Sequence, residues 1–423
     1  MPDVAHTASA CCTRSRPSTR TMLALVLLSV PGHAPAQEPK SVRAVVTVDP
    51  YTEPNPAAMA KAGYVSYAPF QFGRRYDTRD IMALLGDEQL LWIETAHFKV
   101  GCALSPLPLR GETDWVESTK NELKRLKTRL PRVKADARDL DPWLRTHLIA
   151  QRCEELYAEV QDNLGVRDDT FPAAPGHDPS DPEKFYGLGP YLGLEQKFCV
   201  LIVSKASSLA RYTRAYQGHE TELPRRYFDL DYMIFSVAEE SAAGLMKNDH
   251  ALYTHLVYNL AYSLYTSYRW FGHDLPPWLI AGLAHWHGRR ICPRFPAYER
   301  ERDNTNLEQR EFWRWDQRAP GLLRNGAFES IEALMRRPTT TEFGLEQHIQ
   351  SWAFVDFLMA TRKAATMKYV HEMKDPFHNL RRQPTQEELL VRAKTSLERV
   401  FGLDAAGLEA AWKAHLLRGR PKK

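Results

Sequence analysis

Three polar side chains on one uncharged segment are the residues of this chain best suited to chemistry. His255, Asn259 and Tyr262 are spaced by four and three residues, so on a helix they form one stripe along a single face. From Ala251 to Tyr268 the sequence contains no Asp, Glu, Lys or Arg, and a helix without a charged face is usually buried on all sides. An imidazole in such a stripe can bind a metal ion or act as a base. The same stripe can also be a set of buried polar groups that are satisfied by hydrogen bonds.

A second motif follows from Leu275 to Trp286, with the sequence LPPWLIAGLAHW. Together with HLVYN at residues 255–259, this stretch resembles the peptidase-MA-like branch of the gluzincin zinc peptidases. The pattern of that family reads approximately H-E-x-x-H on one helix, followed by L-P-x-W-L-x-E-G-L-A-x-[YW] on the next. Asn259 and Ala281 lie 22 residues apart, which falls within the range that separates the corresponding zinc ligands in gluzincins.

The resemblance implies a zinc site from which most functional side chains are missing. Leu256 stands in place of the general-base Glu, Asn259 in place of the second His, and Ala281 in place of the third ligand, a Glu. Only His255 is kept, and the chain contains no other H-E-x-x-H segment. Zinc prefers imidazole, thiolate and carboxylate ligands, and its bound water needs a general base. We therefore predict a catalytically inactive gluzincin-like protein that holds neither a metal nor another cofactor.

Two histidines after Ala281 offer an alternative. His285 lies one helical turn after Ala281 on the same face, and His287 follows two residues later. A site rebuilt from His255 and His285, with or without Asn259, would make the protein an active zinc metallohydrolase, with zinc as its cofactor.

The resemblance also implies a groove for an extended peptide or protein segment. In gluzincins the strand before the motif helix is commonly the sheet edge along which the peptide lies, and here residues 232–237 take that place. An edge strand binds a peptide through backbone hydrogen bonds whether or not a metal is present. The residues expected to line the groove are Ile234, Ser236, Asn259, Tyr262, Trp278 and Trp286. A further interpretation is a structural protein whose groove is filled by Trp270, Trp278 and Trp286 and binds nothing.

The elements that must position these residues follow from periodicity and from helix-end signals. Asp141 is a plausible N-cap with Pro142 in the first turn, and Gly165 ends that helix. The predicted elements are a strand at 91–100, helices at 116–130, 142–164, 249–270 and 276–290, buried strands at 197–203 and 232–237, and a long loop at 166–194. This order favours an α+β fold, in which a small mixed β-sheet lobe packs on a predominantly helical lobe, as in zincins.

The N-terminus indicates export. Arg14, Arg16 and Arg20 precede the apolar run Met22 to Val30, and an Ala-Pro-Ala cleavage site ends at residue 36, as in a secretory signal peptide. The expected organisation is a signal peptide at 1–36, a poorly structured leader at 37–89, the gluzincin-like domain at 90–418 and a basic tail at 419–423. No segment offers about 20 uncharged apolar residues, so we expect a periplasmic or secreted protein without a membrane span.

Net charge and cysteine content give less information about the partners of the protein. Removing residues 1–36 takes away three arginines and one aspartate, which lowers the formal net charge from +4 to +2. This near balance gives no electrostatic reason to expect nucleic acid as a partner. The four remaining cysteines allow three disulfide pairings in an oxidising compartment, or can simply be buried thiols; they are Cys102, Cys153, Cys199 and Cys292.

Overall fold

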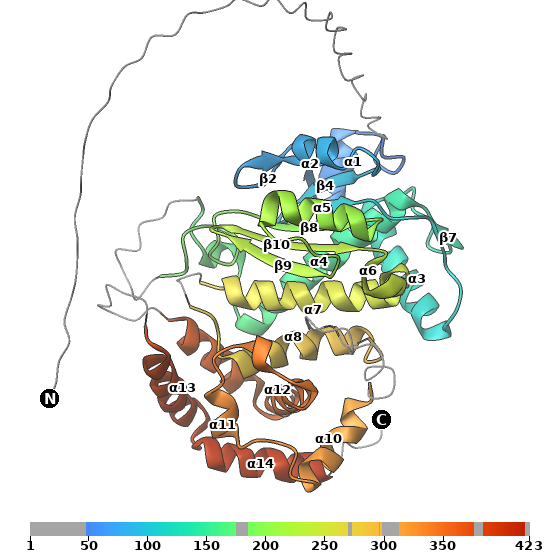
Figure 1. The fold of residues 1–423 in the computed structure, drawn as a ribbon. Helices are drawn as coiled ribbons and strands as arrows, with labels where there is room; N and C mark the ends of the chain where they lie inside the picture. The colour runs from blue at the N-terminus through green and yellow to red at the C-terminus, as the bar shows by residue number, and fades with distance from the viewer. Residues whose placement is uncertain are drawn as a thin grey trace, which may run out of the picture. The chain divides into compact units, whose positions relative to one another are not determined.

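A six-stranded mixed sheet lies between helices on both of its faces in the computed structural model, which describes residues 48–174, 185–269, 273–295, 297, 313–375 and 384–418 (Figure 1). The strand order is β1-β4-β5-β8-β10-β9. The β5–β8 and β8–β10 pairs are parallel, and the other pairs are antiparallel. The strands are β1 Tyr64–Ser66, β4 Leu91–Thr95, β5 Phe98–Cys102, β8 Phe198–Val203, β9 Arg225–Asp229 and β10 Tyr232–Ala238.

Two short hairpins and a set of helices complete the described chain. The hairpins pair β2 Gln71–Gly73 with β3 Tyr76–Asp77, and β6 Leu107–Pro108 with β7 Asp139–Leu140. The helices before the motif are α1 Pro56–Ala62, α2 Thr78–Leu84, α3 Thr113–Arg129, α4 Pro142–Leu164, α5 Ala206–Gln217 and α6 Ser241–Gly244. Those from the motif onward are α7 Asp249–Ser267, α8 Pro277–Ile291, α10 Trp315–Arg324, α11 Ile331–Met335, α12 Leu345–Lys374, α13 Gln386–Phe401 and α14 Ala405–Arg418. Short 3-10 turns lie at Asp168–Thr170, Leu245–Lys247 and Thr340–Glu342.

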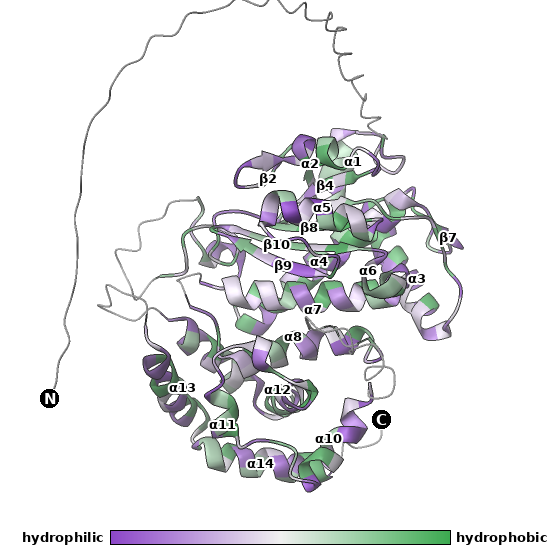
Figure 2. Ribbon diagram, in the orientation of Figure 1, coloured by the Kyte–Doolittle hydropathy of each residue, from purple (hydrophilic) through white to green (hydrophobic). Residues whose placement is uncertain are grey.

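The helices divide between the two faces of the sheet. α5 packs on β8 and β10 from one side, whereas α4 and α7 pack on the other. α7 then packs along α8, which contacts α12 of the helical lobe. Figure 2 shows α7 largely in white and green, because it contains few hydrophilic residues. This composition fits its place between the sheet and α8. The predicted α+β class is therefore confirmed.

The helix predicted from Asp141 to Gly165 is confirmed at both ends. The Asp141 carboxylate accepts a hydrogen bond from the backbone N–H of Leu144, and Gly165 ends α4 in the left-handed region at φ 67°. Only glycine adopts that conformation without a steric penalty. The polar and apolar pattern was sufficient to predict this helix, because the residues that cap it lie at its own ends.

The single strand predicted at 91–100 is wrong, because the chain folds back there into the β4–β5 hairpin. Polar groups satisfy the backbone at the turn. The Thr95 hydroxyl accepts a hydrogen bond from Phe98 N at 3.0 Å, and the Glu154 carboxylate of α4 accepts one from His97 N at 2.9 Å. Glu154 lies far away in the sequence, so this contact cannot be predicted from the local alternation of polar and apolar residues.

The poorly structured leader predicted up to residue 89 is also wrong from Val48 onward. This segment forms α1, α2 and β1 to β3, and Phe72, Ile81 and Leu85 are fully buried in the core layer next to α5. Asp49 lies 3.1 Å from Nε2 of His147 on α4. A Pro-rich composition suggested little core, but many of the apolar residues in this segment are buried in the sheet lobe.

Three further expectations concern the chain termini, the cysteines and membrane spans. The predicted signal peptide and basic tail lie outside the described residues. The four cysteines at 102, 153, 199 and 292 are buried thiols, and none of them forms a disulfide. Across the described residues, no helix combines the length and the apolar character needed to cross a membrane.

Candidate functional site

The two motif helices form and pack on one another as the sequence predicts. α7 begins after Asn248, whose side chain accepts hydrogen bonds from two backbone N–H groups of the first turn. α8 begins with Pro277 and contacts α7 along its length. Gly282 of α8 lies so close to α12 that an added Cβ would come within 2.4 Å of Val355 Cγ2. The motif positions are therefore held between three tightly packed helices.

Asn259 binds an arginine from the sheet edge. The Arg226 guanidinium of β9 donates a hydrogen bond from Nη1 to Asn259 Oδ1 at 2.6 Å. The Asn259 amide in turn donates to the backbone carbonyl of His255 at 2.8 Å, which fixes its orientation. The guanidinium carbon of Arg226 lies 3.9 Å from the ring centroid of Tyr262, one turn further along α7. The predicted polar stripe thus exists, and it receives a cation from the protein itself.

His255, Leu256 and Ala281 lie in weakly polar surroundings. Leu256 and Ala281 are buried in the main hydrophobic core. His255 is partly buried, and its removal from water lowers the pKa of the imidazole to about 4. The ring is therefore neutral near pH 7.

His285 pairs with another histidine. Its Nε2 lies 3.1 Å from Nδ1 of His348 on α12, and its ring packs 4.7 Å from that of Tyr258. Burial holds the pKa of His285 well below its ordinary value, and the positive charges of His348, Arg289 and Arg226 lower it further. Arg226, which binds Asn259, is thus also one of the charges that act on His285.

Two residues near the alternative zinc site have other partners. His287 lies on another side of α8, where its Nε2 is 3.3 Å from the Tyr265 hydroxyl and its Nδ1 is 3.7 Å from Glu159. The Asn259 oxygen, an optional ligand in that alternative, accepts a hydrogen bond from Arg226. Within the part of the chain that is described, no three His, Cys, Asp or Glu side chains are arranged to hold a metal ion.

Two of the predicted groove residues lie on the wrong strand and on the wrong face. β10 is an inner strand and β9 is the edge, so Ile234 and Ser236 are fully buried. Ile234 belongs to the core layer with Leu209 of α5, and Ser236 lies two residues along on the same face. β9 was missed because its pairing through the turn at Leu230 and Asp231 gives only a weak hairpin signal.

The tryptophans also lie away from this edge. Trp278 is fully buried, with its ring 5.1 Å from that of Phe354. Trp286 is partly buried, and the Arg290 guanidinium stacks over it at 4.4 Å. Trp270 lies outside the described residues. Neither described tryptophan fills the space beside β9, which is lined by other side chains.

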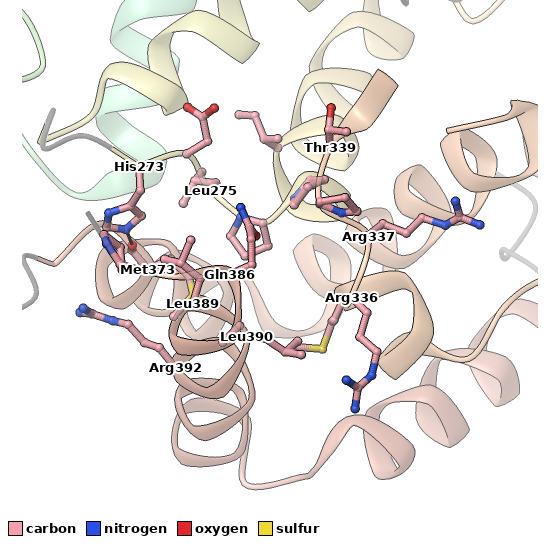
Figure 3. Close-up of a pocket in the computed structure, with 18 of the residues that line it drawn as sticks. His273, Leu275, Arg336, Arg337, Thr339, Met373, Gln386, Leu389, Leu390 and Arg392 are labelled. Atoms are coloured by element: carbon pink, nitrogen blue, oxygen red, sulfur yellow. Dashed lines mark hydrogen bonds between the residues drawn. The ribbon is translucent and has the colours of Figure 1, made fainter. Parts of the chain in front are cut away.

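Two adjoining cavities open next to β9. The first has a volume of about 390 Å³ and is lined by residues of β9, α7 and the end of α12. The second, of about 740 Å³, extends between α8, α11 and α13 (Figure 3). Both are lined by Tyr262, His273 and Asp274, so they lie side by side. Of the predicted groove residues, Tyr262 lines this space. Asn259 accepts a hydrogen bond from Arg226, which also lines it.

Part of the wall of the second cavity is apolar. Leu275, Leu389 and Leu390 face it in Figure 3, and the guanidinium groups of Arg336 and Arg337 point away. Those two arginines pair with Glu332 and Glu329, respectively.

We compared the chain with models of known protein families, with functionally curated proteins and with solved structures, and none of them matches it. The gluzincin resemblance thus stays a prediction from the two segments that form α7 and α8.

Proposed function

We propose that this protein is an exported, catalytically inactive gluzincin-like protein that binds an extended peptide segment along β9. The observation that carries the proposal is the hydrogen bond between Arg226 and Asn259. It connects the open edge of the sheet directly to the helix position where a gluzincin would hold its second zinc ligand.

The absence of activity follows from what occupies that position. A zinc peptidase needs three ligands and a general base that takes a proton from the metal-bound water. Leu256 and Ala281 offer neither a ligand nor a base, and the Asn259 oxygen is engaged by a cation. Two like unit charges 4 Å apart repel by about 4 kcal/mol at an effective dielectric constant of 20, so a fixed guanidinium also disfavours a divalent metal nearby.

Peptide binding is supported by the character of β9. Among the described strands it pairs with β10 alone. Phe228 near its end and Leu230 just after it are 45% and 47% exposed. An exposed edge strand with large apolar side chains is a template for adding another strand. The adjoining cavities provide space for side chains of the added segment.

The inactive site is tested by measuring metal content. Elemental mass spectrometry of the untagged mature protein, dialysed against trace zinc, is expected to give close to no zinc. One zinc per chain would overturn the proposal and favour the rebuilt site. In that case His255→Ala and His285→Ala should each remove the metal.

Peptide binding is tested by placing a charge on the edge. Fluorescence anisotropy with labelled nine-residue peptides of Thr and Val is expected to show at least tenfold weaker binding after Phe228→Lys. Val65→Lys is the matched control, because Val65 lies on β1, the opposite edge of the same sheet, and is 59% exposed. Equal weakening by both variants, or no binding to the unmodified protein, would contradict binding along β9.

A further inference from the structure

A candidate strand lies at the boundary where the described residues begin. The sequence of residues 41–48 is SVRAVVTV, and valine and threonine are enriched in β-strands. The segment contains neither glycine nor proline, which weaken or interrupt strands, and Arg43 is its one charged residue. It therefore has the composition of a strand with a positive charge near its N-terminal end.

The segment joins the described fold beside β1, at the edge of the sheet opposite to β9. Asp49 accepts a hydrogen bond from the Tyr67 hydroxyl at 2.6 Å, and Tyr67 directly follows β1. β1 and β9 are the two outer strands of the six-stranded sheet, so five spacings of about 4.8 Å place them about 24 Å apart. Only Val48 separates residues 43–47 from Asp49, and a residue of extended chain spans at most about 3.6 Å. Residues 43–47 therefore cannot pair with β9 of their own chain.

Negative charge is concentrated at the end of β9. Asp229 is the last residue of the strand, and Asp231 lies in the turn that leads to β10. Burial raises the pKa of Asp231, and the negative charges of Glu195 and Asp229 add to this effect, against the attraction of Arg74. Pairs of opposite charge stabilise neighbouring strands. A basic side chain on an added strand is therefore favoured at this end of β9.

One antiparallel register brings charge and apolar side chains together. When Arg43 lies opposite Asp229, the register places Ala44 opposite Phe228. Residues directly opposite each other lie on the same face of a sheet and are in contact. Phe228 is 45% exposed, and the small side chain of Ala44 leaves room for its ring. The added strand would thus cover an exposed aromatic side chain and place its one charge beside a carboxylate.

The start of β9 favours the same orientation. β9 begins with Arg225, and the antiparallel register places the uncharged Thr47 opposite this arginine. A parallel strand would instead place Arg43 beside Arg225. Like charges directly opposite each other destabilise a pair of strands, so the antiparallel orientation is preferred.

We propose that the segment bound along β9 is residues 43–47 of a second copy of this chain, added antiparallel with Arg43 opposite Asp229. This inference rests on the proposed binding of a peptide along β9, and it names the partner. The segment leaves one edge of the sheet and binds to the opposite edge of the next molecule. Such a contact is heterologous, and it builds head-to-tail chains or closed rings.

Self-association of the untagged mature protein tests the contact. Sedimentation velocity over a range of concentrations is expected to show reversible oligomers. The double variant Val45→Pro/Val46→Pro should weaken self-association at least tenfold, because proline cannot donate to the hydrogen bonds of a sheet. Both positions precede the described fold, so the thermal unfolding temperature should not change. Phe228→Lys should weaken self-association similarly, whereas Val65→Lys on the other edge should not.

A charge exchange tests the register. Arg43→Glu and Asp229→Lys should each weaken self-association by about threefold or more, and the two together should restore it. Lys127→Glu is the matched control, because it makes the same change of charge at an exposed position of α3. It should leave self-association unchanged. Two single variants that weaken association without restoring it in combination would overturn this register.

A labelled peptide of residues 39–48 connects the inference to the proposed function. Fluorescence anisotropy is expected to show that it binds to the protein, and an excess of it should dissociate the oligomers. The same peptide with Val45→Pro/Val46→Pro should do neither. Binding of the 39–48 peptide should also be lost in Phe228→Lys and kept in Val65→Lys.

The outcomes distinguish the two proposals. If Thr/Val peptides bind along β9 but the 39–48 peptide does not, the inference is overturned and the proposed function stands. A protein that stays monomeric at every concentration, or oligomers that survive the proline variant, would also overturn the inference alone. If Val65→Lys weakens self-association and Phe228→Lys does not, the segment pairs with β1 and the inference fails. If no peptide of either kind binds, both proposals fail.

Discussion

At the scale of single residues, the motif positions replace metal chemistry with hydrogen bonds and neutral rings. Asn259 keeps a polar group on the stripe that the sequence predicts, but its partner comes from a strand 33 residues earlier. The periodicity of α7 was sufficient to place His255, Asn259 and Tyr262 on one face. It contains no information about Arg226, because a contact across the sheet edge depends on how β9 pairs.

The neutral state of His255 predicts sensitivity to acid. Its pKa is about 4 in the folded protein, against an ordinary value of 6.5, so between these values the unfolded chain binds a proton that the native residue does not. Stability therefore falls as the pH decreases from 6.5 to 4. Each tenfold change in proton affinity is worth about 1.4 kcal/mol, and partial exposure reduces the effect to about 2 kcal/mol in total. We expect the free energy of unfolding of the unmodified protein, measured in urea, to fall between pH 7 and pH 4. In His255→Leu this fall should be smaller by about 2 kcal/mol.

A histidine with the opposite behaviour provides the control. His97 lies 2.6 Å from Glu154 and 3.1 Å from Asp168. Burial acts to lower its pKa, but these two carboxylates prevail and raise it. Its contribution is present below the ordinary pKa and is lost as the pH rises through the folded value, so His97→Gln should cost more stability at pH 5 than at pH 8. An identical pH dependence in the His255→Leu and unmodified proteins would show that His255 is not desolvated.

At the scale of elements, local signals predicted what lies within a segment, and tertiary pairing decided the rest. α4 carries its own cap residues and α7 its own uncharged face, and both were placed within a few residues. The edge of the sheet was misplaced by one strand, because β10 reads as a buried strand whether or not β9 lies beside it. β4 and β5 were merged because their turn is held by Glu154, which is distant in the sequence.

The packing of α8 on α12 predicts a strict size limit at Gly282. An added Cβ would lie 2.4 Å from Val355 Cγ2 and 2.6 Å from the backbone oxygen of Ser351, and the backbone oxygen cannot rotate away. Overpacking of this kind typically costs about 1–3 kcal/mol. We expect Gly282→Ala to lower the stability by at least that amount in urea unfolding followed by circular dichroism.

The matched control lies on another helix. Gly321 of α10 has no atom within 4 Å of an added Cβ, and alanine is favoured over glycine in a helix by about 0.5–1 kcal/mol. Gly321→Ala should therefore leave stability unchanged or raise it slightly. A neutral Gly282→Ala would mean that α8 and α12 are further apart than the structure places them, and that the motif helices are less firmly held.

At the scale of the whole molecule, a buried charge network joins the start of α7 to the elements around it. Arg145 and Arg152 of α4 pair with Asp249 at 3.5 Å and 3.0 Å, and Arg152 also pairs with Glu122 of α3 at 2.8 Å. Arg145 further pairs with Glu239, just after β10. The motif helix is therefore positioned by the sheet lobe, of which the segment from Val48 to residue 89 is a part. Composition alone could not predict that this segment is part of the sheet lobe, because the packing of a Pro-rich segment depends on its tertiary contacts.

Deletion of that segment tests its contribution. Removing residues 1–47 should leave the thermal unfolding temperature nearly unchanged, because every buried residue described here is kept. Removing residues 1–89 would take away β1, α2 and the fully buried side chains of Phe72, Ile81 and Leu85. Each is worth about 1.5–3 kcal/mol when buried, and a typical domain is stable by only about 5–15 kcal/mol. The longer deletion should therefore unfold or aggregate at temperatures where the shorter one is folded.

A point variant distinguishes the contribution of the buried apolar residues of this segment from that of the Asp49 hydrogen bonds. The Asp49 carboxylate accepts hydrogen bonds from Thr52 at 2.7 Å and Tyr67 at 2.6 Å and faces His147, and these partners hold its pKa well below the usual range despite burial. Asp49→Asn keeps the size of the side chain and removes the charge, so it should lower stability by about 1–3 kcal/mol without preventing folding. If the 1–89 deletion unfolds at the same temperature as the 1–47 deletion, the segment is an independent leader after all, and the domain begins near Leu90. If only the longer deletion fails while Asp49→Asn folds, the segment contributes chiefly through its buried apolar residues, and the groove beside β9 belongs to a sheet that the N-terminal residues help to build.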